Sequence, residues 1–149
     1  MEFENLSEHA KHEARRVAAA FELETWSQTP PYPADLYVEF EGYVGGILVD
    51  WDVDNTGQIG AVGVKSKDND WIQVINYAEY GWRFDEEWRG QANPILKNFF
   101  ACGLYRLGIE RENLFTFLGQ SFTAHEKLEL RVSMPREFWL KEWFDGGEA

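Results

Sequence analysis

The sequence predicts an α+β protein in which an antiparallel β-meander sheet is packed on one face by an N-terminal helix and a central apolar helix. Three observations support this prediction: helical spacing of apolar residues near the N-terminus, alternation of polar and apolar residues between positions 36 and 77, and a second helical pattern at 94–107. Short turn-forming segments between the alternating stretches favour antiparallel pairing. The length of 149 residues fits a single domain, 1–149.

The first helix is predicted to run from Leu6 to about Thr25. Apolar residues recur there at intervals of three and four, which is the pattern of a helix with one buried face. Asn5, with Glu8 three residues later, resembles a capping box, so we expect Asn5 to cap this helix. The prolines within 30–33 cannot continue a helix, because proline lacks the amide donor, and they predict a short, stiff connection.

Three or four strands are expected between residues 36 and 77. Polar and apolar residues alternate within each strand, and clusters of glycine, asparagine and aspartate separate the strands. In the second strand, apolar side chains share one face, while Leu48, Asp50 and Asp52 share the other. The expected strands are residues 36–41, 47–53, 59–64 and 71–77, with turns at 54–57 and 68–70.

The second helix is predicted from Pro94 to Leu107. Asn93 is a capping residue in front of a proline at the first helical position, and apolar residues follow at helical spacing. Gly108 is a natural C-terminal stop. Beyond this helix, the sequence predicts two strands and a closing helix, at residues 114–118, 128–132 and 135–144 respectively.

The negative charge of the chain is concentrated in one part of the sequence. The formal net charge is −12, and residues 35–87 contribute −9 of it, with twelve acidic and three basic residues. Nucleic-acid binding depends on basic contacts with phosphates, and anionic membranes attract basic segments, so neither is an expected partner. No signal-peptide pattern or long apolar run is present, and Cys102 is the single cysteine. We therefore expect a cytoplasmic protein without disulfides.

Acidic and aromatic residues of this region form the candidate partner-binding surface. Asp50, Asp52 and Asp54 alternate with apolar residues, so on a strand they project to one face at intervals of about 6.6 Å. Three unpaired carboxylates are too costly to bury, which predicts that this face meets water, a metal ion or a basic partner. A solubilising role explains such a face equally well. The complete candidate set is Asp50, Asp52, Asp54, Asp68, Asp70, Trp71, Tyr80, Trp82, Asp85, Glu86 and Glu87.

Two glycine-containing segments resemble ligand-binding loops. Residues from Asp52 to Ile59 resemble the first eight positions of an EF-hand calcium loop. Its twelfth position is Gly63 instead of the bidentate glutamate, and strands flank it, so an acidic hairpin turn is favoured over calcium binding. Residues 57–66 contain the glycines of a phosphate loop without its Gly-Lys-Ser/Thr order, which favours strand glycines at bulges or close backbone approaches.

Candidate catalytic groups are few. His9 and His12 lie one turn apart on the first helix, and an exposed, ion-paired helix face is favoured there over a metal site. Cys102 lies among apolar residues, which favours packing over a nucleophile activated by His125. The adjacent acids at 85–87 resemble the carboxylate pair of glycoside hydrolysis, but sequence neighbours rarely converge on one substrate. We expect no catalytic residue, no metal and no cofactor.

These features favour a stoichiometric protein-binding inhibitor of a basic nuclease or nucleic-acid-handling effector. Charge would select the partner and aromatic side chains would anchor it. In size and charge, the chain is similar to toxin-immunity, anti-restriction and anti-CRISPR proteins, which occupy a basic groove or imitate nucleic acid. The alternative is a small ligand-binding or enzymatic domain with an aromatic pocket. A buried acid with a perturbed pKa in a pocket would favour that alternative, and a continuous acidic and aromatic surface would favour the inhibitor.

Overall fold

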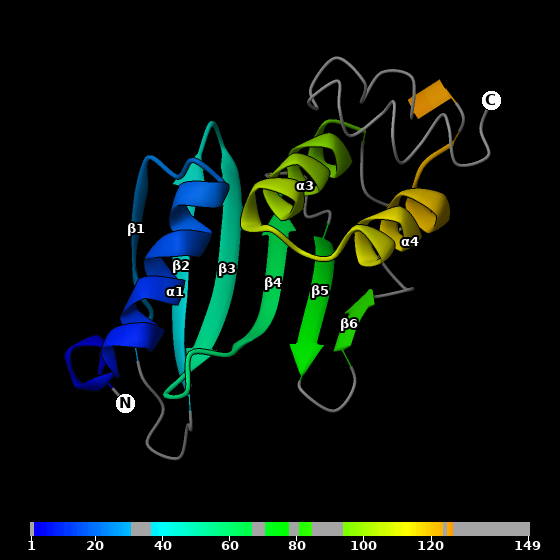
Figure 1. The fold of residues 1–149 in the computed structure, drawn as a ribbon. Helices are drawn as coiled ribbons and strands as arrows, with labels where there is room; N and C mark the ends of the chain where they lie inside the picture. The colour runs from blue at the N-terminus through cyan, green and yellow to red at the C-terminus, as the bar shows by residue number, and fades with distance from the viewer. Residues whose placement is uncertain are drawn as a thin grey trace.

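The computed structural model describes residues 2–30, 37–66, 71–77, 81–84, 94–123 and 125–126. It confirms the α+β class, with one antiparallel sheet packed by helices (Figure 1). Six strands of the described chain form this sheet in the order β1-β2-β3-β4-β5-β6, which is a meander. The elements are η1 (Phe3–Asn5), α1 (Glu8–Ala20), β1 (Thr25–Gln28), β2 (Tyr37–Val44), β3 (Ile47–Asp54), β4 (Ile59–Lys65), β5 (Trp71–Tyr77), β6 (Gly81–Phe84), α3 (Pro94–Leu107) and α4 (Arg111–Ser121).

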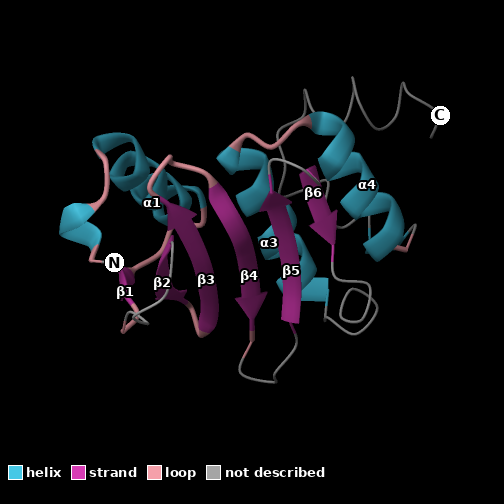
Figure 2. Ribbon diagram, turned by 90° about the horizontal axis from the view of Figure 1, so that it is seen from below, coloured by secondary structure: helices cyan, strands magenta, loops and turns pink. Residues whose placement is uncertain are grey.

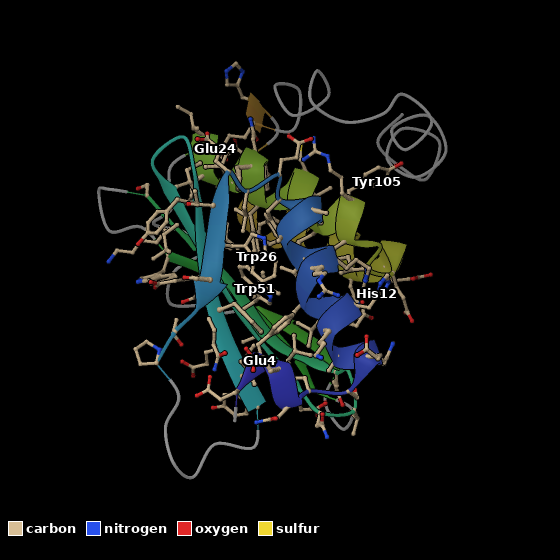
Figure 3. All side chains as sticks on the ribbon, turned by 90° about the vertical axis from the view of Figure 1, so that its left-hand side faces the viewer. Glu4, His12, Glu24, Trp26, Trp51 and Tyr105 are labelled. Carbon is tan, nitrogen blue, oxygen red and sulfur yellow. The ribbon has the colours of Figure 1, made fainter. Side chains whose placement is uncertain are left out.

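The helices and the sheet form two layers. α1 packs on β3 and α3 packs on β4, while α3 also contacts α1 and α4 (Figure 2). Viewed from the side, the strands stand on one side of the molecule and α1 and α3 on the other (Figure 3). The apolar faces of both layers meet in one core, whose largest fully buried side chains include Phe21, Phe40, Phe100, Phe117, Leu96, Leu104 and Val49. The predicted packing of both helices on one face is confirmed.

The start of α1 is fixed by Ser7. The Ser7 hydroxyl oxygen accepts a hydrogen bond from the amide of Ala10 at 3.1 Å, so Ser7 is the N-cap. The prediction of Asn5 as the cap is wrong, because Asn5 belongs to η1, one turn earlier. Ser7 also donates its amide to Oδ1 of Asn55 at 2.7 Å and its hydroxyl to the Asn55 carbonyl at 2.9 Å. These bonds tie the start of α1 to the turn between β3 and β4.

The first helix is shorter than predicted. It ends at Ala20; Phe21 and Glu22 form a turn, and Thr25, the last residue of the predicted helix, begins β1. Glu22 adopts a left-handed φ of 54°, and the Leu23 amide donates to the Ala18 carbonyl at 3.1 Å. This is the hydrogen bond of a Schellman motif, in which the chain reverses direction after a helix. The spacing of apolar residues does not reveal this reversal, because Phe21 continues the helical period of the residues before it.

An aromatic cluster attaches β1 to the rest of the sheet. The Trp26 ring lies 5.9 Å from the rings of both Phe40 and Trp51, measured between centroids, and Phe40 and Trp51 stack at 5.5 Å. Phe3 of η1 closes the cluster with an edge contact to Phe40 at 5.8 Å. Figure 3 shows Trp26 and Trp51 side by side between the sheet and α1. These contacts hold the inward faces of β2 and β3 against η1.

The second predicted helix is confirmed as α3, and Gly108 ends it. Gly108 has a φ of 86°, which favours glycine, and its amide donates to the Leu104 carbonyl at 3.1 Å. Asn93, its expected cap, lies outside the described residues. Glycine also matters inside α3, because a β-carbon at Gly103 would overlap the ring of Phe21. The absent side chain therefore lets α1 and α3 approach closely.

The strand predicted at 114–118 is wrong, because these residues belong to α4. Leu114, Phe117 and Leu118 are all fully buried, at intervals of three and four. A short apolar run fits a buried helix as well as a strand, and packing against α3 decides between them. The strand at 128–132, the helix at 135–144 and the turn at 68–70 lie outside the described residues. β6 was not predicted.

A buried ion pair connects α3 to the segment after α4. Nζ of Lys97, a residue only 6% exposed, lies 2.9 Å from Oε1 of Glu126. The same carboxylate accepts the Thr123 amide at 2.9 Å, and the Glu126 amide donates to the Thr123 hydroxyl at 3.1 Å. This is a reciprocal capping box, which was not predicted.

Replacing Ser7 with alanine removes both the helix cap and the bonds to the β3–β4 turn. We expect Ser7→Ala to lower the free energy of unfolding by about 1–2 kcal/mol, measured by urea denaturation. The matched control is Ser27→Ala, at an exposed position on β1, which should change stability by less than about 0.5 kcal/mol. Equal effects of the two substitutions would contradict this role of Ser7.

Candidate functional site

Four carboxylates lie together on the face of β2 and β3 that points away from α1 and α3. The two strands alternate, so Phe40 and Trp51 are buried in the core while their sequence neighbours point outward and are half-buried. We call these outward carboxylates the acidic face; they are Glu39, Glu41, Asp50 and Asp52. The prediction that Asp50 and Asp52 share one face is confirmed. Glu39 and Glu41 were not among the predicted site residues.

The strand register places the four acids in two opposing pairs. Glu41 is directly opposite Asp50, and Glu39 is directly opposite Asp52. Opposing residues of an antiparallel pair have β-carbons about 4.5–5.5 Å apart, and like charges in this arrangement destabilise the sheet. The pairing is invisible in the sequence until the register of β2 and β3 is known. Given that register, the alternation Glu-Phe-Glu at 39–41 is the signal that would have found both glutamates.

Small residues of β4 form the floor beside the acidic face. A β-carbon at Gly63 would lie 2.8 Å from Oδ1 of Asp50, and one at Gly60 would overlap Oδ1 of Asp52. Both aspartates therefore lean over the backbone of β4. This agrees with the expectation that these glycines mark close backbone approaches. The result is a depression of about 280 Å³, lined by the acidic face together with Thr29, Phe40, Trp51 and Ala61.

The two aspartates of the acidic face hold protons unusually strongly. Burial and the charges of Glu39 and Glu41 raise the pKa of Asp50 to about 6, although the Gly63 amide hydrogen bond opposes this. Burial and the charge of Glu39 likewise raise the pKa of Asp52 to about 6, against hydrogen bonds from the β4 backbone. Both causes disfavour the ionised form. The acidic face therefore carries variable charge near neutral pH.

The Asp54 carboxylate, unlike those of Asp50 and Asp52, is hydrogen-bonded within the turn that follows β3. Its Oδ1 accepts hydrogen bonds from the Thr56 amide at 2.8 Å, the Thr56 hydroxyl at 2.6 Å and the Gln58 amide at 3.0 Å. Burial by itself raises the pKa of Asp54, but these hydrogen bonds outweigh it and lower the pKa. The carboxylate therefore closes its own turn, as in an Asx turn.

The turn geometry also bears on the resemblance to a calcium loop. Strands β3 and β4 flank the turn, whereas helices flank an EF-hand loop. Within the described residues, no group of three or more histidine, cysteine, aspartate or glutamate side chains is placed to hold a metal ion. The hairpin interpretation of 54–57 is confirmed.

Aromatic side chains border the acidic face. Tyr37 and Tyr43, at the two ends of β2, are 39% and 49% exposed. Trp71 approaches from β5: its ring would lie 3.3 Å from a β-carbon at Gly63. Nζ of Lys65 sits 5.5 Å from the centre of the Trp71 ring, a cation–π contact. The outward face thus combines carboxylates with accessible aromatic surface, and the two tyrosines were not predicted.

The remaining predicted partner-binding residues, or their side chains, lie outside the described part of the chain. Trp82 lies on β6, opposite Asn76, but its side chain is outside the described set. The following candidates also lie outside the described residues: Asp68, Asp70, Tyr80, Asp85, Glu86 and Glu87.

The other constellations support structural interpretations. His9 and His12 are exposed on α1, where neighbouring acids pair with Lys11 and Arg16, and the His9 ring packs beside Gly57. Cys102 is buried in α3, and burial raises the pKa of its thiol, which disfavours the nucleophilic thiolate.

Comparisons with known proteins do not assign a function to this site. No protein-family model, curated protein or solved structure matches the chain. Among the described helices, none combines the length and apolar character that crossing a membrane requires. The geometry of the candidate site is therefore the basis for proposing its function.

The raised pKa values of Asp50 and Asp52 predict how the free energy of unfolding changes with pH. The folded protein binds the protons of Asp50 and Asp52 more tightly than the unfolded chain does. Protonation of these two aspartates therefore stabilises the fold fully below about pH 4, and this stabilisation is lost as the pH rises through about 6. We expect Asp50→Asn, which can still accept the Gly63 amide, to raise the free energy of unfolding by about 1–2 kcal/mol at pH 8 and to change it little at pH 4.

Urea denaturation at both pH values measures this effect. The matched control is Glu4→Gln, which removes an exposed carboxylate of η1. It should leave the difference in stability between pH 4 and pH 8 unchanged. An Asp50→Asn variant with the same pH dependence as the parent protein would show that Asp50 ionises normally.

Proposed function

We propose that this protein acts by binding, as a stoichiometric inhibitor of a basic nuclease or another nucleic-acid-handling protein. The observation that carries the proposal is the opposition of like charges across β2 and β3. Glu41 faces Asp50 and Glu39 faces Asp52, an arrangement that reduces the stability of the sheet. A solubilising surface needs only separated, fully hydrated charges. A basic partner would offset the repulsion by placing cations between the opposing carboxylates.

The distribution of charge and aromatic surface supports the same proposal. Residues 35–87 contribute −9 to a net charge of −12, and the acidic face lies within this segment. A concentrated field of one sign accelerates the encounter with an oppositely charged protein, while aromatic side chains contribute most to interface stability once buried. Tyr37 and Tyr43 are exposed at the border of the acidic face and are suited to that role.

The proposed partner is a protein whose natural ligand is nucleic acid. Such proteins present arginine and lysine to neutralise phosphates, and the carboxylates of the acidic face would occupy those residues in place of phosphates. Along one strand, Asp50 and Asp52 repeat at about 6.6 Å, so the charges form an ordered row. Inhibition of the immunity, anti-restriction or anti-CRISPR type would follow from this competition.

A small ligand-binding or enzymatic domain is the second candidate function. The observation in its favour is that two aspartates with a pKa near 6 line one depression of about 280 Å³. Acid–base catalysis uses groups whose pKa lies near the working pH. However, the described lining is dominated by carboxylates, and a substrate bound there would itself have to be cationic. We therefore favour the protein-binding function.

Affinity capture with the full chain tests the proposed function. We expect the bait to recover a basic nucleic-acid-handling protein from the native host or its phage-infected form, and the purified partner to lose activity on nucleic acid at a 1:1 ratio. Neutralising the acidic face (Glu39→Gln, Glu41→Gln, Asp50→Asn and Asp52→Asn) should weaken binding at least about tenfold and flatten its salt dependence.

The matched control carries the same number of neutralised acids elsewhere: Glu4→Gln, Glu8→Gln, Glu24→Gln and Glu112→Gln, all at exposed positions. Because both variants have the same net charge, the comparison separates the acidic face from the charge of the whole protein. Equal binding by the two variants would contradict the assignment of the surface. Recovery of a small cationic metabolite alone would favour the second candidate.

A further inference from the structure

We propose that Asp50 and Asp52 form a proton-controlled switch, which releases a bound basic protein from the acidic face when the solution becomes mildly acidic. This inference rests on the proposed function and adds the regulation of that site. It starts from a difference within the acidic face, between the two aspartates of β3 and the two glutamates of β2. Asp50 and Asp52 lean over β4, whereas Glu39 and Glu41 lie on β2, across the strand pair.

The position of the aspartates shields them partly from water, since both are half-buried. Asp50 packs beside Gly63 and accepts its amide, and Asp52 packs beside Gly60 and accepts its amide. Because glycine has no side chain, each carboxylate can approach the β4 backbone. The backbone amides hold the carboxylates in place but do not supply a full positive charge.

The charged groups around these aspartates are mostly of the same sign. β2 contributes Glu39 and Glu41. On β3, each of the two aspartates is a like-charged neighbour of the other, and Asp54 lies at the end of the strand. On the same face, β4 contributes Lys65, which lies beyond Gly63 and contacts the Trp71 ring. From β1 the acidic face meets the uncharged Ser27, opposite Glu41. Burial and the repulsion between carboxylates therefore both disfavour the charged aspartates, and protonation relieves both.

The titration range of both aspartates supports this switch. Their pKa values of about 6 mean that they are mainly charged at pH 7.5 and mainly neutral at pH 5. The pKa of Asp54 is lowered instead, so that carboxylate keeps its charge over the same range. A basic partner binds the charged form better, and binding must then release protons near pH 6. Each aspartate can contribute up to about a tenfold loss of affinity between pH 7.5 and pH 5.

Two measurements on the full-length protein test the switch. First, carboxyl-carbon NMR titration of the free protein should place Asp50 and Asp52 between pH 5 and 7. Second, a synthetic nona-arginine peptide serves as a basic probe, with its affinity measured from pH 5 to pH 7.5 at constant salt. The parent protein should bind this probe about tenfold more tightly at pH 7.5 than at pH 5.

Matched variants assign the effect to Asp50 and Asp52. The double variant Asp50→Asn/Asp52→Asn should bind the probe more weakly at pH 7.5 and lose most of the pH dependence. The double variant Glu39→Gln/Glu41→Gln removes the same number of charges from the same face, yet should keep a pH dependence with its midpoint moved to lower pH. Amide NMR spectra of both variants show whether the fold is retained.

The possible failures are distinguishable. Titration of both aspartates near pH 4, or a pH dependence that survives in Asp50→Asn/Asp52→Asn, would overturn the switch and leave the proposed function intact. Titration between pH 5 and 7 without measurable probe binding at any pH would overturn the proposed function, and the release with it.

Discussion

The pairing register of β2 and β3 is the constraint on which the rest of this structure depends. Phe40 lies opposite Trp51 and Glu41 opposite Asp50, so one register sends the aromatic pair into the core and the acidic pair outward. A shift by one residue would exchange the two faces of a strand, burying carboxylates and exposing the aromatic rings. The core thus fixes the register, and the register fixes the geometry of the acidic face.

The same hairpin also connects the sheet to the helical layer. The turn after β3 accepts hydrogen bonds from Ser7 at the start of α1, and Asp54 closes that turn. Trp51, on the inward face, packs in the aromatic cluster that holds β1. A rigid hairpin supports a binding surface better than a loop does, since less conformational freedom is lost when a partner binds.

The acidic face has an energetic cost that the fold tolerates. Opposed carboxylates repel one another, and burial at the β4 backbone adds a desolvation penalty. The apolar core, from α1 and α3 to the inward side of the sheet, outweighs these penalties. Stability given up at one surface is a common feature of functional sites, because function requires groups arranged for a partner and not for the isolated protein.

The sequence by itself determined the α+β class, the meander, the bounds of α3 and the outward position of Asp50 and Asp52. These follow from periodicity and turn residues, which act over a few neighbouring positions. Only the tertiary structure decided where α1 ends, that residues 114–118 are helical, and that Glu39 and Glu41 face the two aspartates. The physical reason is that packing and strand register join residues distant in sequence, and the charges that meet across β2 and β3 depend on that register.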